Sequence, residues 1–400
     1  MKLQRLTILG ATGSVGTSTL DVARRHPDRI TVHALTANRD AAGLAALCRE
    51  FKPALAVIGD EAAAQQLQQE LGAGIRVRGG AAALAEVAGD GDADTVMSAI
   101  VGAAGLTPTL AAVRAGKRVL IANKEPLVMA GRLLLAQAEA HGATLIPIDS
   151  EHNAIFQCLP GGFRCGTADP GVRALVLTAS GGPFRDLPLA ELAQVTPEQA
   201  VRHPNWVMGP KISVDSATMM NKGLELIEAH HLFGMREAQI QVVLHPESVV
   251  HSLVEYADGS TLAQLGQPDM RVPIAHALAF PERWESGVGG LKLDEIARLN
   301  FRPVEGKRYP ALGLARDALR AGGILPNVLN AANEVAVDAF LSGRTGFTRI
   351  AEIIEGTLAA AVGAPLPAEA TLEAILEVDA WARRRAASLV ERPKRAVAHA

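Results

Sequence analysis

Short apolar runs alternate with amphipathic stretches through the first 150 residues of the chain. Runs of strand length occupy residues 6–9, 30–35, 54–58, 94–98, 118–121 and 144–148. Helical patterns lie between them, for example at residues 41–51, behind the candidate N-cap Asp40. Alternating strands and helices predict a parallel sheet that is covered on both faces, and ligands of such sheets bind beyond the carboxyl ends of the strands.

The pattern changes after residue 150. An apolar run at 174–178 predicts a strand, and two extended runs, 247–256 and 260–265, predict a hairpin around Asp258-Gly259. Residues 285–310 are Gly-rich and irregular, and helical stretches follow at 311–321, 326–342, 347–362 and 371–390. We therefore predict an α/β fold with an N-terminal Rossmann-like parallel sheet in residues 1–149, a central α+β domain in 150–285, a linker in 286–310 and a C-terminal four-helix bundle in 311–400.

The composition is that of a folded protein without a strong charge bias. Lys and Arg number 39 against 42 for Asp and Glu, and only 4% of the residues are aromatic. These values argue against a nucleic-acid partner, which selects for basic patches and stacking side chains. The three cysteines fit neither a disulfide framework nor a thiolate metal site, so we expect free thiols in a reducing compartment.

One uncharged segment has the length of a membrane span. Residues 95–113 carry no charge, but Gly102, Gly105 and Pro108 interrupt them in the order of a strand, a turn and a helix. We predict a buried βα unit there. The N-terminus enters a strand without the pattern of a signal peptide, so we expect a cytoplasmic protein with no membrane partner.

The first candidate site is a glycine-rich turn. Gly10-Ala-Thr-Gly13-Ser-Val-Gly16 follows the first strand and begins a helix. Glycines let the backbone approach a pyrophosphate, and the helix N-terminus stabilises its charge. The spacing differs from the usual dinucleotide fingerprint, so a tight turn that binds nothing is the alternative. After the second strand, Asn38 and Arg39 stand where NAD-binding proteins place an acid, and arginine favours the ribose phosphate of NADPH.

A second candidate site begins with two acids beyond the strand at 144–148. Asp149 and Glu151 flank Ser150, and in an extended chain residues i and i+2 point the same way. Paired carboxylates suit a hard cation such as Mg²⁺ or Mn²⁺. The alternative is that the two acids lie in a solvated loop and bind no metal. A third oxygen ligand would favour the metal site.

The segment Lys211–Glu225 is the most polar stretch of an otherwise apolar chain. If the chain is helical from Asn221 onward, Asn221 and Glu225 share one face, and Lys222 lies beside Glu225. Glu228 lies one turn further, so spacing alone allows either glutamate as the third metal ligand. Lys222 is equally suited to an ordinary salt bridge.

Hydrogen-bond donors that suit a phosphate occur in three regions of the sequence. They are Ser180-Gly181-Gly182, Ser216, Asn221 and Lys222. The loop at 203–209 precedes the polar stretch, and its Trp206 predicts either a lid over a bound substrate or a hydrophobic anchor. We expect structural roles for the histidines His230, His231, His245 and His251.

Six segments that carry these residues occur in one order along the chain. They are Gly10–Gly16, Asn123-Lys124-Glu125, Asp149–Glu151, Ser180–Gly182, His203–Gly209 and Lys211–Glu225. In that combination the chain resembles the 1-deoxy-D-xylulose 5-phosphate reductoisomerase family over essentially its whole length. The resemblance implies an NADPH-dependent oxidoreductase that isomerises 1-deoxy-D-xylulose 5-phosphate and reduces it to 2-C-methyl-D-erythritol 4-phosphate, in the methylerythritol phosphate route to isoprenoids. It also implies a divalent cation (Mn²⁺, Mg²⁺ or Co²⁺), a lid at residues 203–209 and a homodimer.

The resemblance assigns roles to individual residues. Metal ligands fall on Asp149, Glu151 and Glu225, which selects Glu225 over Glu228, and Lys124 joins these acids as a catalytic residue. Substrate contacts fall on Lys124, Ser150, Glu151, Ser180, His203, Trp206, Ser216, Asn221, Lys222 and Glu225. Cofactor contacts fall on Thr12, Gly13, Ser14, Val15, Ala37, Asn38, Arg39, Asn123, Glu125 and Gly209. Residues 36–39 depart from the family pattern, which leaves open whether Asn38 or Arg39 meets the ribose phosphate.

Two other functions compete with this interpretation. Another two-domain NADPH-dependent oxidoreductase would explain the N-terminal region without requiring Asp149, Glu151 and Glu225 to converge on a metal. A nucleotide-binding sensor without catalysis would keep the glycine turn, but it would have no use for Lys124 together with these three acids.

Overall fold

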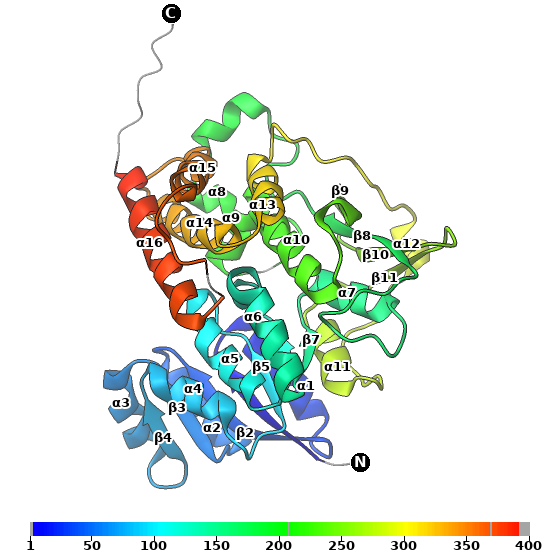
Figure 1. Cartoon of the computed structure of the whole chain (residues 1–400). Helices are drawn as coiled ribbons and strands as arrows, with labels where there is room; N and C mark the ends of the chain where they lie inside the picture. Colours follow the sequence, from blue (N-terminus) through cyan, green and yellow to red (C-terminus); the bar gives the residue numbers. More distant parts are fainter. Residues whose placement is uncertain (1–2, 207, 369, 392–400) are drawn as a thin grey trace, which may run out of the picture.

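A seven-stranded parallel sheet forms the N-terminal region of this computed structural model, which describes residues 3–206, 208–368 and 370–391 (Figure 1). The strands are β1 (Gln4–Leu9), β2 (Ile30–Ala37), β3 (Leu55–Ile58), β4 (Arg76–Gly79), β5 (Thr95–Ser98), β6 (Arg118–Ile121) and β7 (Thr144–Pro147). Their order across the sheet is β4-β3-β2-β1-β5-β6-β7. The edge strand β4 was not predicted, because the exposed Arg76 and Arg78 interrupt any apolar run.

Helices cover both faces of this sheet. They are α1 (Ser14–Arg25), α2 (Ala41–Phe51), α3 (Glu61–Leu71), α4 (Ala81–Gly89), α5 (Leu106–Arg114) and α6 (Glu125–His141). The chain moves outward from β1 to β4 and then from β5 to β7, so right-handed crossovers place α1–α3 and α4–α6 on opposite faces. The strand order reverses between β1 and β5. The glycine turn after β1 therefore lies at the switch point where sheets of this kind bind ligands.

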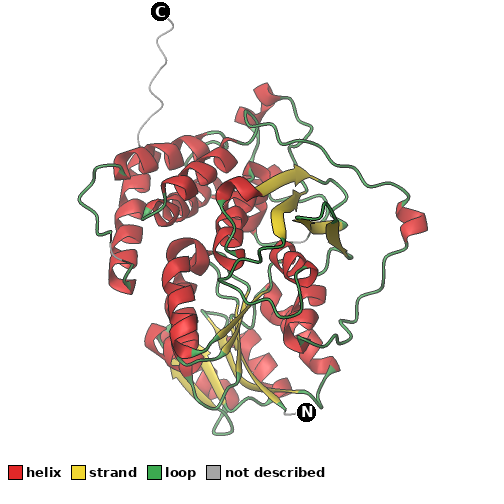
Figure 2. Ribbon diagram, turned by 45° about the vertical axis from the view of Figure 1, so that its right-hand side comes forward, coloured by secondary structure: helices red, strands yellow, loops and turns green. Residues whose placement is uncertain are grey.

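A second, mixed sheet of four strands lies beyond the carboxyl ends of the strands of the first sheet (Figure 2). Its strands are β8 (Val172–Ala179), β9 (Ile240–Leu244), β10 (Val250–Tyr256) and β11 (Thr261–Leu265), in the order β11-β10-β8-β9. The predicted turn at Asp258-Gly259 joins the antiparallel β10 and β11, with Gly259 at φ +88°. β9 was not predicted, since only two of its five residues are buried and its apolar pattern is weak.

Helix α10 connects the parts of the molecule. The helices of the central region are α7 (Ser150–Cys158), α8 (Pro197–Ala200), α9 (Pro210–Thr218), α10 (Met220–Phe233) and α11 (Arg271–Ala279), with 3₁₀ turns at Leu189–Gln194 and Glu237–Gln239. Another 3₁₀ turn, Ala103–Gly105, lies between β5 and α5. The helix predicted from Asn221 onward is thus confirmed. α10 contacts α6 of the first region, α9 before it and two of the C-terminal helices. Because it is buried on nearly all sides, its polar side chains lie inside the protein.

The C-terminal helices follow a long connection of little regular structure. This connection contains the short α12 (Leu293–Ile296), and a bridge between Leu244 and Arg302 ties it to the second sheet. Then come α13 (Pro310–Ala321), α14 (Leu325–Leu341), α15 (Arg349–Ala361) and α16 (Leu372–Val390). All four match the predicted stretches closely, and α14 contacts the other three. Residues 392–400 of the predicted bundle lie outside the described residues.

One hydrophobic cluster runs from Leu6 in β1 to Ala386 in α16. The core therefore does not separate at the proposed boundaries, and the division into domains stays a prediction. The uncharged segment at 95–113 forms β5, a turn with Gly102 at φ +82°, and α5, as predicted. Among the described residues, no helix is long and apolar enough to cross a membrane.

Candidate active site

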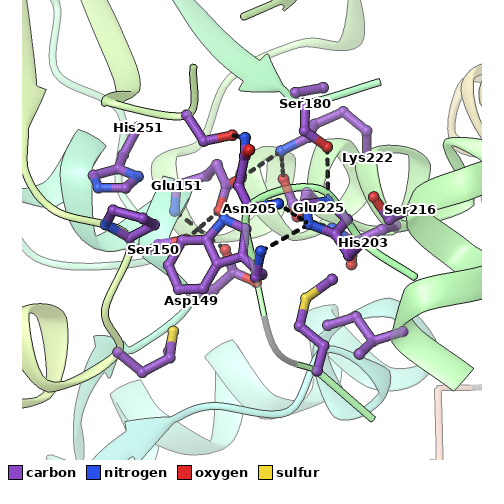
Figure 3. Close-up of a pocket in the computed structure, with 18 of the residues that line it drawn as sticks. Asp149, Ser150, Glu151, Ser180, His203, Asn205, Ser216, Lys222, Glu225 and His251 are labelled. Carbon is purple, nitrogen blue, oxygen red and sulfur yellow. Dashed lines mark hydrogen bonds and ion pairs between the residues drawn. The ribbon is translucent and has the colours of Figure 1, made fainter. Parts of the chain in front are cut away.

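A cavity of about 420 Å³ lies where the two sheets approach each other (Figure 3). Residues that follow β1, β6 and β7 line it on one side, and residues of β8, β10 and α9–α10 line it on the other. All the residues expected to bind metal or substrate line this cavity: Lys124, Asp149, Ser150, Glu151, Ser180, His203, Trp206, Ser216, Asn221, Lys222 and Glu225. Segments far apart in the chain thus meet in one place.

Three carboxylates converge at the base of this cavity. Asp149, Glu151 and Glu225 each place an oxygen within 4.8 Å of the other two. The expectation that the chain stays extended at 149–151 is wrong, because Asp149 caps α7 and accepts a hydrogen bond from the Glu151 backbone N–H at 3.2 Å. The carboxylates still converge, since the cap and the first helical turn both face Glu225 on α10.

Two lysines lie among these acids. The ammonium of Lys222 pairs with Glu151 Oε1 at 2.8 Å and with Glu225, so the salt bridge considered for Lys222 is present. Lys124 pairs with Asp149 and lies 3.3 Å from Glu225 Oε1 and 3.8 Å from Glu228 Oε2. All these side chains are largely or fully buried.

The cluster contains more carboxyl groups than its lysines can neutralise. Burial, and then repulsion from Glu151, raises the pKa of Glu225. Burial also raises the pKa of Glu228 to about 8, although Lys124 opposes the shift. A bound cation would lower both pKa values, and three carboxylates at this separation offer the oxygen ligands that a hard divalent ion requires. The residues present therefore fit a metal.

Hydroxyl and imidazole groups form the opposite wall of the cavity. Ser180 Oγ lies 2.8 Å from His203 Nε2 and accepts from the Gly182 backbone N–H at 3.1 Å. His203 Nδ1 accepts from the backbone N–H groups of Asn205 and Trp206, so Nε2 carries the proton of the neutral ring and donates to Ser180. Burial lowers the pKa of His203 to about 4, which keeps the ring neutral.

One histidine departs from its expected structural role. His251 on β10 lines the cavity, with its ring centroid 6.2 Å from that of Trp206. No sequence motif marked it, because its position depends on how β10 pairs with β8. The structural role of His245 is confirmed, since Nδ1 donates to Asn300 O at 2.9 Å and Nε2 accepts from two backbone N–H groups.

The glycine turn opens into the same cavity. Gly10 has φ +84°, and a Cβ on Gly16 would lie 2.3 Å from the Gly10 carbonyl oxygen, so only glycine fits these two positions. Gly13 caps α1 without a side-chain hydrogen bond. Ser14 and Val15 line the cavity, as does Gly209 from the loop before α9.

The other residues expected at the cofactor lie outside the cavity lining. Thr12 is half-buried, Ala37 is buried, Asn38 is exposed, and the exposed Arg39 pairs with Asp60 at 3.4 Å. The structure turns Asn123 and Glu125 inward. Asn123 Oδ1 accepts from Ser98 Oγ at 3.4 Å, and Glu125 pairs with Lys211 at 3.0 Å.

Lys211 joins three parts of the chain. Its ammonium pairs with Glu125 at the start of α6 and with Asp215 on α9 at 2.9 Å. Asp215 in turn accepts from Asn333 Nδ2 of α14 at 2.8 Å. Lys211 and Asp215, both from the polar stretch Lys211–Glu225, thus hold helices together beside the cavity.

Comparisons with known proteins agree over the whole chain. Family models match at residues 6–131 (1-deoxy-D-xylulose 5-phosphate reductoisomerase), 145–233 (the C-terminal domain of that enzyme) and 265–385 (DXP reductoisomerase C-terminal domain). The 1-deoxy-D-xylulose 5-phosphate reductoisomerase of Ralstonia nicotianae is 60% identical over 388 residues, which cover 96% of this chain and 97% of that protein. That of Methylobacillus flagellatus is 57% identical over 96% of this chain and 97% of that protein.

Solved structures of the same enzyme are similar throughout. The enzyme from Zymomonas mobilis, solved with NADPH, is 49% identical with a TM-score of 0.90, and the match covers 98% of this chain and 100% of that one. A reductoisomerase solved with NADPH, fosmidomycin and magnesium is 50% identical with a TM-score of 0.92, over 97% and 98% of the two chains. Together with the cavity, these similarities show that the chain belongs to the 1-deoxy-D-xylulose 5-phosphate reductoisomerase family.

Proposed function

We propose that this protein converts 1-deoxy-D-xylulose 5-phosphate to 2-C-methyl-D-erythritol 4-phosphate with NADPH and a divalent cation. The observation that carries the proposal is the convergence of Asp149, Glu151, Glu225 and Lys124 beside the glycine turn, inside one cavity. Relatives at about 60% identity carry this activity in their names, and solved relatives bind NADPH, fosmidomycin and magnesium.

Asp149, Glu151 and Glu225 would hold the metal, Mg²⁺ or Mn²⁺ by the preference of oxygen ligands. When bound, the cation polarises the substrate carbonyl and NADPH supplies the hydride. Lys124 lies among the same acids and is placed to donate or accept a proton at the substrate oxygens while the carbon–carbon bond is cleaved and re-formed. Ser150, whose Oγ donates to Glu151 at 2.6 Å, orients that ligand and faces the substrate.

The far wall would bind the phosphate. Ser180, His203 and Ser216 present hydroxyl and imidazole groups, and Asn221 and Lys222 reach the same space from α10. Such donors hold a phosphate as a remote handle, whose binding energy orients the reacting end of the substrate. The loop at 203–209 would close over this handle, with Trp206 as its apolar cover.

The cofactor would lie along the glycine turn. Thr12, Gly13, Ser14 and Val15 offer backbone N–H groups at the start of α1 for the pyrophosphate. Ala37, Asn38 and Arg39 follow β2, and the exposed guanidinium of Arg39 suits the ribose phosphate of NADPH. Gly209 lines the same cavity and would border the nicotinamide, whereas Asn123 and Glu125, which contact Ser98 and Lys211, would support this wall.

The edge strand β11 supports a homodimer. Among the described residues it pairs only with β10, and its other edge is open. Leu262 is 49% exposed and Leu265 is 36% exposed on this strand. Open apolar edges pair readily with a second chain. Light scattering of the protein should give the mass of two chains, and Leu262→Lys should shift it toward one.

One assay tests the activity directly. The protein is supplied with 1-deoxy-D-xylulose 5-phosphate, NADPH and Mn²⁺, and nicotinamide absorbance is followed with and without a chelator. We expect oxidation of NADPH only when both the sugar phosphate and the metal are present. NADPH binding without any turnover would instead support the non-catalytic alternative, and turnover that is insensitive to the chelator would support a metal-independent oxidoreductase.

A further inference from the structure

A second group of metal-ligand side chains lies directly behind the cavity. Asp149, His152 and Glu228, named here the inner triad, each place one ligand atom within 4.8 Å of the other two. We call Asp149, Glu151 and Glu225 the outer triad; the two groups share Asp149. His152 and Glu228 do not line the cavity and play no part in the proposed reaction.

The hydrogen bond of His152 fixes which ring nitrogen is free. Nε2 lies 2.9 Å from the Glu225 carbonyl oxygen, which can only accept, so Nε2 carries the proton. In the neutral ring, Nδ1 then presents a lone pair. This atom is buried and has no hydrogen-bond partner among the described residues, and the whole side chain is 0% exposed.

The lone pair of His152 faces other acceptors. Nδ1 lies 3.6 Å from Asp149 Oδ1 and 3.9 Å from Glu228 Oε2, and both distances exceed hydrogen-bond length. Glu228 Oε2 is also buried without a hydrogen-bond partner among the described residues, and its nearest cation is Lys124 at 3.8 Å. Buried acceptors that face one another without a partner are unfavourable unless a proton or a metal cation lies between them.

The spacing and the chemistry indicate a metal ion. With metal–ligand bonds of about 2.1 Å, two ligands of one ion lie at most about 4.2 Å apart, and both distances from Nδ1 fall within that limit. A histidine whose other nitrogen donates to a backbone carbonyl is the usual arrangement for metal-binding imidazole. The nitrogen ligand favours Zn²⁺, whereas the all-oxygen outer triad favours Mg²⁺ or Mn²⁺.

We propose that the inner triad is a second cation site, selective for Zn²⁺, which competes with the outer triad for Asp149. Only one carboxylate is shared, so an ion bound to Asp149, His152 and Glu228 removes a ligand from the outer triad. Zn²⁺ would then act as an inhibitor of the enzyme, a consequence that rests on the proposed function. The existence of the inner site does not rest on that function.

Metal binding to the full-length protein, first stripped of metal, tests the proposal. Isothermal titration with ZnCl₂ and with MnCl₂ compares the wild type with Glu228→Gln, His152→Gln and the matched control Glu225→Gln. We expect Glu228→Gln and His152→Gln to weaken Zn²⁺ binding by at least about tenfold and to leave Mn²⁺ binding nearly unchanged. Glu225→Gln should show the reverse pattern.

Two results would overturn the inner site. One is Zn²⁺ affinity that survives Glu228→Gln, and the other is an equal loss of Zn²⁺ and Mn²⁺ affinity in Glu225→Gln. Glu228→Gln preserves shape, so the test stands even if the buried His152→Gln fails to fold. Co²⁺ absorbance gives a second readout, with an imidazole-ligated spectrum expected in the wild type and lost in Glu228→Gln. Turnover with Mn²⁺ is measured separately, so failure of the proposed reaction is distinguishable from failure of the inner site.

Discussion

Two walls of the cavity, the glycine turn and the acid–lysine cluster, are built in different ways. The glycine turn presents backbone groups at the start of α1, and its shape depends on Gly10 and Gly16. The acid–lysine cluster presents buried side chains from the ends of β6 and β7 and from α10, held in mutual ion pairs. A backbone site tolerates changes in its side chains, whereas a buried charge cluster depends on every member, because removal of one charge alters the electrostatic environment of all its neighbours. Substitutions on these two walls should therefore have effects that differ in size and in kind.

The largest effect is expected at Lys124. Lys124→Ala should lower kcat by about 10²–10⁴-fold, the range for loss of a general acid or base, with NADPH affinity unchanged. Steady-state kinetics with the NADPH absorbance assay measures it, and Lys307→Ala, an exposed lysine far from the cluster in sequence, is the control. A loss of NADPH affinity in Lys124→Ala would mean that the two walls are not separate.

Removal of one metal ligand should have the next largest effect. Glu225→Gln should weaken Mn²⁺ binding by at least about tenfold, because even groups that only orient metal ligands contribute that much. Metal-dependent turnover should fall while NADPH binding stays near normal. The exposed Glu295→Gln serves as control, and a metal titration of turnover that matches the wild type would falsify the role of Glu225.

On the backbone wall, Gly16→Ala should act through packing. The added Cβ would lie 2.3 Å from Gly10 O and 2.6 Å from Ala11 O, and overpacking of this kind costs about 1–3 kcal/mol. Urea unfolding should show the lower stability, and NADPH affinity should fall with it. Gly74→Ala, where an added Cβ meets nothing within 4 Å, should change neither.

The smallest effect is expected at Arg39. Arg39→Ala should weaken NADPH binding by about tenfold or less, because a charge-assisted contact at an exposed position is screened by water. NADH affinity, measured by fluorescence titration, should not change. Equal losses for both nucleotides would point to Asn38 as the residue that meets the ribose phosphate.

The sequence predicted the local features of this protein well. The cap Asp40 accepts from the Gly43 backbone N–H at 2.9 Å, Asp258-Gly259 forms its hairpin turn, and the four C-terminal helices lie where their periodicity placed them. Each of these depends on residues within a few positions of one another. Local backbone preferences therefore suffice to predict them.

The sequence did not predict features that depend on residues far apart along the chain. Strand β9 pairs with β8 across more than sixty residues of chain, and His251 reaches the cavity only through the pairing of β10. The ion pair between Glu125 and Lys211 was not predicted either, and the role of Glu125 at the cofactor stays a prediction. The convergence of Asp149 and Glu151 was predicted for the wrong reason, since α7 begins there and the chain is not extended.

By itself, the sequence determined most of the strands and helices, the glycine turn and the residue types of the cavity. The tertiary structure decided which of these side chains meet. It placed Glu225 against Asp149 and Glu151, and it left Glu228 facing His152 behind them. The physical reason is that side-chain convergence depends on how buried helices and strands pack, and chemical pairing between residues about seventy positions apart leaves no periodic signal in the chain.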